Sequence, residues 1–316
     1  MKVEKIDNVE IFPDDKIKLT TMGNVYEILR MDRINKKSCI LVLDKDFYID
    51  LRTGERKEFE HHENRACDRN ELRKTMRRLR GLINANCSDV SKCRWITFTY
   101  AENMTDTDTV YRDCQKLIQK VRYRLGHFEY IHVVEPQGRG AWHIHALWIF
   151  DDKAPFIDSA WLRNVWGNGF VTVKKLDDVD NVGAYLTAYL CDCDLEDYVR
   201  DKLFKNGYSL PADLDFDSFD ASELDREVVS KELSQDGKKV SKRIVKGGRL
   251  HMYPPNFNLY RASRGIQKPI EEHMTYENAQ KKIGSAQPTF STAIQLSDDV
   301  SGFENVIIKE YYNKLR

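Results

Sequence analysis

The sequence predicts an α+β fold built around an antiparallel sheet, and three observations within residues 93–191 support this prediction. Segments in which apolar and polar residues alternate, as in β-strands, are interspersed with segments whose apolar residues recur every three or four positions, as in helices. These segments follow one another in the order β-α-β-β-α-β-α. Two of the strands are joined only by the glycine-containing stretch PQGRGA, so we expect them to run antiparallel.

Seven elements are expected in this part of the chain. They are, in order, the strand RWITFTY, the helix DTDTVYRDCQKLIQKVRYRLG, the strand EYIHVVE, the strand WHIHALWIF, the short helix PFIDSAWLRNVWG, the strand GFVTVKKL and the helix DNVGAYLTAYLCD. This order is that of a ferredoxin-like, or split βαβ, unit with one added helix. We expect the helices to cover one face of the antiparallel sheet and to leave the other face available for a site.

Smaller additions are expected at both ends of this unit. In residues 1–90, strand-like runs flank a turn at RTGE, and the helix NELRKTMRRLRGLINAN carries basic residues on several faces. Those basic residues form either a solvated surface or a contact for phosphate. The patterns in residues 195–316 are weaker, and DNA binding or oligomerisation is a hypothesis for them. We therefore divide the chain into residues 1–90, a central domain of residues 91–194, and residues 195–316.

The charges of the chain balance, because 50 Lys and Arg face 50 Asp and Glu. Net charge alone therefore does not indicate a nucleic-acid-binding protein. The balance hides local excesses of each sign. Residues 65–94 contain nine basic and three acidic residues, and residues 192–227 contain twelve acidic and four basic ones.

The composition also predicts where the protein resides. No apolar run reaches the length of a membrane span, and the first residues lack the apolar core of a signal peptide. The seven cysteines have no regular spacing, which favours reduced thiols over a disulfide framework. We therefore expect a cytoplasmic protein.

Two histidines stand one residue apart in the strand WHIHALWIF. Side chains alternate between the faces of a strand, so His143 and His145 point the same way. Glu135, near the end of the preceding strand, joins them if the register allows. Two imidazoles and a carboxylate form a three-ligand site for Mg²⁺ or Mn²⁺, with Zn²⁺ less expected, that leaves room for a substrate oxygen. The alternative is a pair of structural histidines at a sheet edge.

Two tyrosines lie in the helix that follows. Tyr185 and Tyr189 are four residues apart, which puts them on one helical face. They are either core aromatics or phenols presented outward from a helix of mostly small and aliphatic residues. A phenol is a weak nucleophile near neutral pH because its pKa is about 10. A metal that polarises a nearby phosphate would make attack on phosphorus feasible.

Three stretches, WITFTY, EPQGRGAWHIHALWIF and VDNVGAYLTAYL, resemble in order and spacing the three motifs of the HUH endonuclease superfamily. More closely, they resemble the rolling-circle replication initiators of phages, plasmids and integrative elements. Each motif alone is unspecific, whereas the three together are specific. The resemblance extends over about residues 93–191.

This resemblance implies a metal-dependent endonuclease. His143, His145 and Glu135 match the positions of the metal ligands. Tyr185 and Tyr189 match the nucleophiles, which attack single-stranded origin DNA, form a 5′-phosphotyrosine and release a 3′-OH that primes rolling-circle synthesis. The implied partners are the origin strand and a host helicase and polymerase, since the chain has no NTPase phosphate-loop motif of its own. No membrane partner is expected.

Further residues are candidates for contact with the DNA backbone. They are Thr97, Thr99, Arg139, Lys174 and Lys175. The two lysines are included because many relatives carry a lysine three residues after the first tyrosine, and Ala188 stands there in this chain. Which tyrosine cuts first stays open, although position favours Tyr185.

Two other functions are compatible with the same motifs. One is a tyrosine transposase of the same superfamily, since the difference lies in which DNA ends are joined. The other is a catalytically silent DNA-binding protein that keeps the fold. Conjugative relaxases fit less well, because their tyrosine usually precedes the histidine motif.

Overall fold

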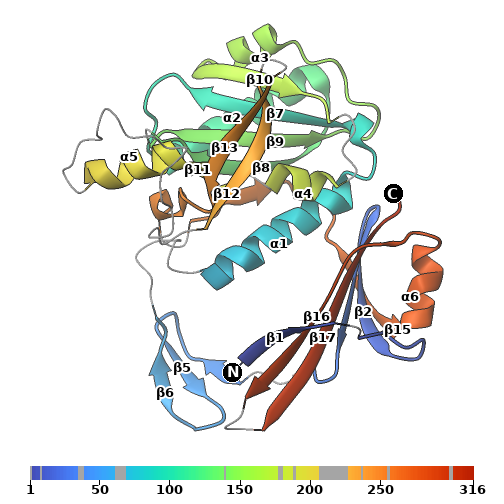
Figure 1. Ribbon diagram of the computed structural model, residues 1–316. Coiled ribbons are helices and arrows are strands. Elements are labelled where there is room, and N and C mark those ends of the chain that lie inside the picture. The colour runs from blue at the N-terminus through green and yellow to red at the C-terminus, as the bar shows by residue number, and fades with distance from the viewer. Residues whose placement is uncertain are drawn as a thin grey trace. The chain divides into compact units, whose positions relative to one another are not determined.

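The computed structural model describes residues 2–7, 9–34, 39–60, 69–138, 140–176, 181–187, 190–205, 227–235, 238–254, 257–298 and 302–316. For residues 69–70, 201–205, 231–235 and 238–240 only the backbone is described. Within these residues the chain forms six α-helices and four antiparallel sheets, which confirms the predicted α+β class (Figure 1). In this part of the chain, no helix is long and apolar enough to cross a membrane.

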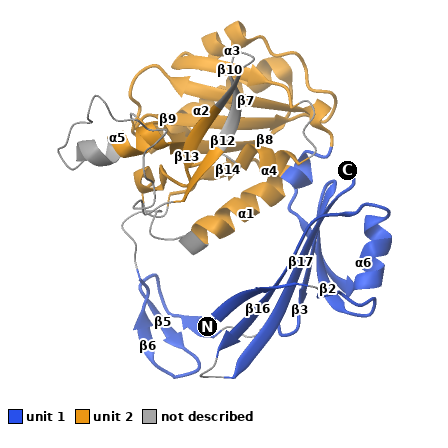
Figure 2. Cartoon of the chain, in the orientation of Figure 1, with its two compact units in different colours: residues 1–62, 84–88, 267–316 blue, residues 63–83, 89–266 orange. Residues whose placement is uncertain are grey.

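The chain divides into two compact units (Figure 2). Unit 1 comprises residues 1–62, 84–88 and 267–316, and unit 2 comprises residues 63–83 and 89–266. The expected central domain, residues 91–194, lies entirely within unit 2.

Unit 1 is built on a six-stranded sheet that combines strands from both ends of the chain. Its strands are, in spatial order, β1 (Lys2–Ile6), β16 (Pro288–Asp298), β17 (Phe303–Asn313), β3 (Val25–Met31), β2 (Lys16–Met22) and β15 (Ile270–Thr275). Sequence analysis treats the two ends as separate additions, whereas the structure pairs Lys2 with Ser297 and Ile308 with Arg30. The two ends therefore form one structural unit.

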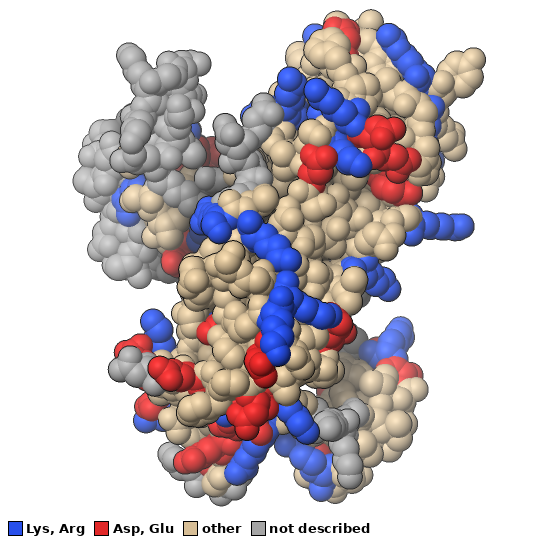
Figure 3. All heavy atoms as spheres, turned by 90° about the vertical axis from the view of Figure 1, so that its right-hand side faces the viewer, with Lys and Arg blue, Asp and Glu red and all other residues tan. Residues whose placement is uncertain are grey.

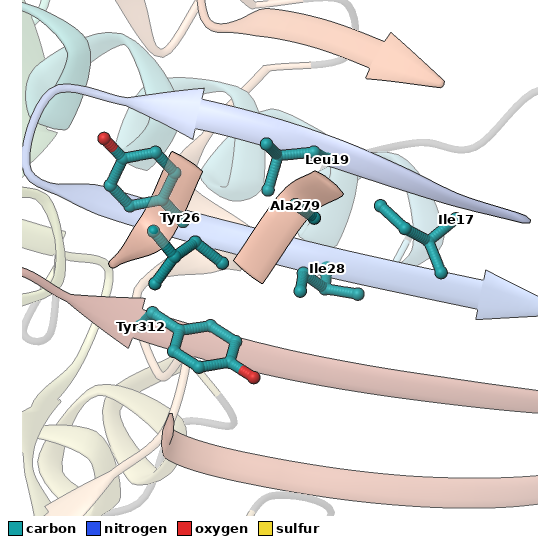
Figure 4. Packing of buried hydrophobic residues seen from close by; sticks show 7 residues of the cluster. Ile17, Leu19, Tyr26, Ile28, Ala279 and Tyr312 are labelled. Carbon is teal, nitrogen blue, oxygen red and sulfur yellow. The ribbon is translucent and has the colours of Figure 1, made fainter. Parts of the chain in front are cut away.

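The core of unit 1 lies between this sheet and helix α6 (Tyr276–Ile283). Figure 4 shows strand residues Ile17, Leu19, Ile28 and Tyr312 packed around Ala279 of the helix. Alternation along β2 and β3 places these apolar side chains on the face that meets α6.

A small second sheet in unit 1 contains β4 (Ile40–Val42), β5 (Phe47–Asp50) and β6 (Arg56–Glu58). The turn predicted at RTGE lies between β5 and β6, as expected.

Unit 2 is built on a five-stranded antiparallel sheet. Its strands are, in spatial order, β10 (Gly169–Lys174), β7 (Cys93–Tyr100), β9 (Trp142–Ile149), β8 (Glu129–Pro136) and β14 (Tyr260–Ala262). Between them along the chain come α2 (Thr107–Leu125) and α3 (Ser159–Trp166), followed by α4 (Val182–Thr187). The predicted order β-α-β-β-α-β-α is therefore present. Gly169 allows β10 to start close to β7, since a Cβ there would come within 2.3 Å of the Thr99 carbonyl oxygen.

Helices α2 and α3 cover one face of this sheet. Trp166 of α3 packs against Phe98 and Tyr100, and the Tyr100 hydroxyl donates to Asp113 of α2. The opposite face carries Thr97, Thr99 and both histidines of β9, because these residues alternate with the buried ones. That opposite face is not bare, since Leu147 and Val133 on it are buried as well.

The remaining elements of unit 2 surround the sheet. They are α1 (Arg69–Asn86), whose last residues belong to unit 1, the 3₁₀ turns η1 (Val90–Lys92) and η2 (Leu250–Met252), helix α5 (Leu195–Lys205), and a three-stranded sheet of β11 (Cys193–Asp194), β13 (Lys238–Val245) and β12 (Val228–Gln235).

Candidate active site

The strand register brings the predicted metal ligands onto one face of the five-stranded sheet. His143 of β9 lies between Thr99 of β7 and Glu135 of β8, in one row across the three strands. His145 lies in the next row, beside Thr97 on β7. Residues directly opposite each other on antiparallel strands point to the same side, so all five side chains share a face.

His145 is held in a fixed orientation by three neighbours. Its Nδ1 lies 3.2 Å from the Thr97 hydroxyl and its Nε2 lies 2.9 Å from Glu135 Oε2. Its ring stacks on Trp95 with a centroid distance of 5.4 Å and an interplanar angle of 5°. Thr97 was predicted as a contact for the DNA backbone, but here its hydroxyl orients a histidine. Such outer contacts commonly fix the orientation of a metal-binding imidazole.

Glu135 is buried, and its two carboxylate oxygens have different partners. Oε2 faces His145, whereas Oε1 accepts a hydrogen bond of 3.0 Å from the backbone N–H of Cys191. The guanidinium of Arg249 lies 3.7 Å from Oε1. A buried carboxylate needs such partners, because burial without them would strongly disfavour its charged form.

The donor set fits a divalent cation in chemistry and in spacing. Two ligand atoms that each lie about 2.1 Å from one octahedral ion at right angles are about 3 Å apart. The separation of 2.9 Å between His145 Nε2 and Glu135 Oε2 matches this spacing. The ring of His143 is turned by 83° from that of His145. Accordingly, no three His, Cys, Asp or Glu side chains of the described residues form a closed ligand group in this conformation.

The tyrosine helix α4 begins and ends with specific side-chain contacts. At its start, Asn181 Oδ1 accepts from the Ala184 N–H at 2.9 Å, whereas the expected cap, Asp180, lies outside the described residues. At its end, the Thr187 hydroxyl donates to the Gly183 carbonyl and accepts from Arg80 of α1 at 3.2 Å. One arginine of the basic helix therefore contacts the tyrosine helix, a role that the sequence did not reveal.

The side chain of Tyr185 is 54 % exposed, so it is not a core aromatic. This favours the second of the two readings of the tyrosine pair. Tyr189 lies outside the described residues.

The predicted backbone contacts fall at different distances from the cluster. Lys174 pairs with Trp95 on the outer strand β10, and its exposed side chain is on the histidine face. Two strand spacings, about 10 Å, separate β10 from β9. Lys175 follows it and is exposed, while Arg139 lies outside the described residues.

Sequence reasoning missed two contributors to this cluster. Trp95 was assigned to a strand without a role at the site, and Arg249 was only part of a basic stretch. Arg249 reaches Glu135 across more than a hundred residues of chain, and no local pattern encodes that approach. Charge on the surface also gives no guide, since Figure 3 shows Lys and Arg interspersed with Asp and Glu on the face drawn.

Comparison with known proteins gives one match. No curated protein and no solved structure matches the chain. A protein-family model does match, and its span begins at β7 and ends at β11, so that it includes the strands of His143, His145 and Glu135 and the helix of Tyr185. Over residues 93–193 the chain is similar to the family described as Replication-associated protein ORF2.

Proposed function

We propose that this protein is a replication initiator that nicks and rejoins single-stranded origin DNA through a tyrosine, with a divalent cation bound by His143, His145 and Glu135. The observation that carries the proposal is the cluster of Glu135 and the two histidines on one sheet face, within the segment that matches a replication-associated family. The exposed Tyr185 on the next helix supplies a nucleophile.

The topology of unit 2 supports the expected ferredoxin-like arrangement of this catalytic domain. The spatial order β10-β7-β9-β8 puts the first and third strands of the βαββαβ unit at its centre. In that arrangement the central strand β9 carries the histidines, and its neighbours supply Thr97 and Glu135.

The proposed reaction exchanges one phosphate ester for another. The phenolic oxygen of Tyr185 forms a bond to phosphorus, and the bond between phosphorus and the 3′-oxygen breaks. The phenol loses its proton and the leaving 3′-oxygen takes one up, so charge and bond number are conserved. Because the phosphodiester energy is kept in the phosphotyrosine, a 3′-OH can reverse the step without a nucleotide cofactor. A bound Mg²⁺ or Mn²⁺ would supply Lewis-acid polarisation of the scissile phosphate.

The chain's own residues prepare the site for this reaction. Thr97 and Trp95 fix the ring plane of His145, and the Cys191 amide fixes one oxygen of Glu135. The same amide belongs to the segment that follows the tyrosine helix. The positions of Glu135 and of that segment are therefore linked by one hydrogen bond.

The decisive experiment tests for a covalent adduct. The full chain is incubated with Mn²⁺ and single-stranded oligonucleotides that tile the DNA around its own gene, each labelled at the 5′ or the 3′ end. We expect one strand to transfer its 3′ label to the protein, because a 5′-phosphotyrosine retains the 3′ segment. The adduct should be lost in Tyr185→Phe or in the double variant with Tyr189→Phe.

Tyr123→Phe is the matched control, since Tyr123 is an exposed tyrosine on α2 of the same unit. Its adduct yield should equal that of the unmodified chain. Specific binding of a strand without any adduct would instead favour a silent DNA-binding protein. Joining of two element ends, rather than release of a priming 3′-OH, would favour a transposase.

A further inference from the structure

The segment after the tyrosine helix is held by a second stretch of chain that lies outside the family match. We call residues 244–253 the clasp. It meets residues 191–194 through five contacts, namely the strand pairs Cys193–Val245 and Asp194–Ile244, the Arg249 N–H to the Cys191 carbonyl at 3.0 Å, the Gly247 N–H to Asp192 at 2.9 Å, and Lys246 to Asp192 at 2.6 Å. The clasp thus fixes the chain just beyond the tyrosines.

Cys191 connects the clasp to Glu135. Its backbone has φ of +67°, a left-handed conformation that costs free energy in a residue other than glycine. The conformation is retained because both backbone groups are bonded. The N–H donates to Glu135 Oε1, and the carbonyl accepts from the Arg249 N–H.

The Arg249 side chain lies beside the same carboxylate and keeps hydrogen-bonding capacity in reserve. Its terminal nitrogens lie 3.7 Å from Glu135 Oε1 and 3.8 Å from Asp197 Oδ2, beyond hydrogen-bond length. Among the described residues, no acceptor lies within hydrogen-bond distance of its buried Nε. A guanidinium has five N–H donors in a planar fork that matches phosphate oxygens.

The other basic side chains of unit 2 are less suited to act at this cluster. Lys174 lies two strands from the histidines, a distance of about 10 Å. Arg80 already donates to Thr187. Within the described part of the chain, Arg249 is the Lys or Arg that lies within ion-pair distance of Glu135.

We propose that Arg249 contacts a non-bridging oxygen of the scissile phosphate and neutralises the charge that develops there in the transition state. This inference rests on the proposed function, because it requires a phosphodiester beside Glu135. The donors of Arg249 face the carboxylate that would share the site with that phosphate. Loss of one donor to developing oxyanion charge typically slows a reaction by about 10²–10³-fold.

The test compares Arg249→Gln and Arg249→Lys with the unmodified chain in single-turnover adduct formation. We expect Arg249→Gln to react about 10²–10³-fold more slowly, with Arg249→Lys in between because it keeps the charge but loses the fork. Arg200→Gln is the matched control, since Arg200 is an exposed arginine of α5 in a helical pair with Glu196. Its rate should be unchanged.

A second readout separates phosphate contact from a structural role. With a neutral methylphosphonate at the scissile position, Arg249→Lys should react at the same rate as the unmodified chain, since no charge remains to be neutralised. Mn²⁺ affinity, measured from the electron paramagnetic resonance signal of free Mn²⁺, should stay within about threefold in every variant. Arg249→Lys also keeps the comparison valid if Arg249→Gln does not fold.

The outcomes distinguish the two proposals. Adduct formation by the unmodified chain with Arg249→Gln within threefold of it would overturn this inference and leave the proposed function intact. An equal loss on both substrates, or a parallel loss of Mn²⁺ affinity, would also overturn it, because either result indicates positioning of Glu135. Failure of the unmodified chain to form any adduct would overturn both.

Discussion

The six-stranded sheet of unit 1 and the five-stranded sheet of unit 2 both contain networks of polar side chains, but the partners differ in origin. In unit 1, the Tyr312 hydroxyl donates to Glu310 at 2.6 Å and accepts from Gln280 at 2.7 Å. These partners come from its own strand and from the helix packed on it. In unit 2, Glu135 is held instead by Cys191 and Arg249, which belong to segments outside the sheet.

This difference separates a structural network from a functional candidate. The network around Tyr312 satisfies the polar groups of a core and extends no further. The network around Glu135 joins the histidine strand to the segment after an exposed tyrosine and retains donors on Arg249. Buried polar groups are costly unless satisfied, so a cluster held by distant segments indicates a requirement beyond packing. The predictions below test whether this distinction holds.

The largest effect is expected from His143→Ala. Removal of a metal ligand should lower the rate of Mn²⁺-dependent adduct formation by at least about 10³-fold, more than the 10–100-fold typical of changes around a ligand. His127→Ala is the matched control, because His127 is an exposed histidine of unit 2 that pairs with Glu129. Adduct yield in His143→Ala equal to that of the control would show that His143 is not a ligand.

A pH effect on stability is expected from His132, on the face of the sheet opposite the cluster. Burial lowers the pKa of His132 to about 3, and its Nε2 accepts from the Trp148 indole. The unfolded chain takes up a proton below about 6.5, whereas the folded chain does so only near pH 3. Stability is therefore lost as pH falls through this window, by up to about 5 kcal/mol at its lower end.

Urea titrations at several pH values measure this effect. His132→Gln keeps a side-chain acceptor but does not titrate, so its free energy of unfolding should depend less steeply on pH between about 6.5 and 3. Equal slopes for both proteins would mean that His132 takes up its proton in the folded state.

A smaller effect is expected from Thr97→Val, which keeps the shape of the side chain and removes the hydroxyl that orients His145. Mn²⁺ affinity should fall about 10–100-fold, as for other outer contacts of metal-binding histidines. Thr172→Val is the matched control, since Thr172 lies opposite Thr97 on β10 and is exposed. An Mn²⁺ dissociation constant within twofold of the unmodified chain would remove Thr97 from the site.

Local patterns predicted the parts of the fold that depend on neighbouring residues. Alternation in WITFTY and WHIHALWIF predicted strands with the histidines on one face, and the observed register pairs His143 with Glu135. The same alternation separated Trp95 and Thr97 from the core residue Phe98. The element order followed because each element is encoded within about ten to twenty residues.

The remaining features depend on contacts between distant segments, which periodicity does not encode. Nothing in the sequence of β1 indicates that Lys2 pairs with Ser297. Likewise, the approach of Arg249 to Glu135 depends on the pairing of β11 with β13. Thr97 illustrates a third limit, because its face was predicted but its partner was not. A hydroxyl on a sheet face has several acceptors within reach, and packing decides between them.

The smallest effect is expected in unit 1, from Tyr312→Phe. The change removes a buried hydroxyl that bonds to Glu310 and Gln280, and loss of such bonds costs about 1–3 kcal/mol of stability. Tyr26→Phe is the matched control, because Tyr26 belongs to the same apolar cluster and its hydroxyl has no hydrogen bond within the described residues. That control should change the free energy of unfolding by less than about 0.5 kcal/mol.

The informative part of this prediction is what should not change. At a temperature where Tyr312→Phe is folded, its rate of adduct formation and its Mn²⁺ affinity should equal those of the unmodified chain, because its network ends within unit 1. If adduct formation fell while the variant stayed folded, polar groups of unit 1 would contribute to the reaction. The distinction between a structural and a functional network would then be wrong, and the interior of both sheets would have to be searched for residues that contribute to the site.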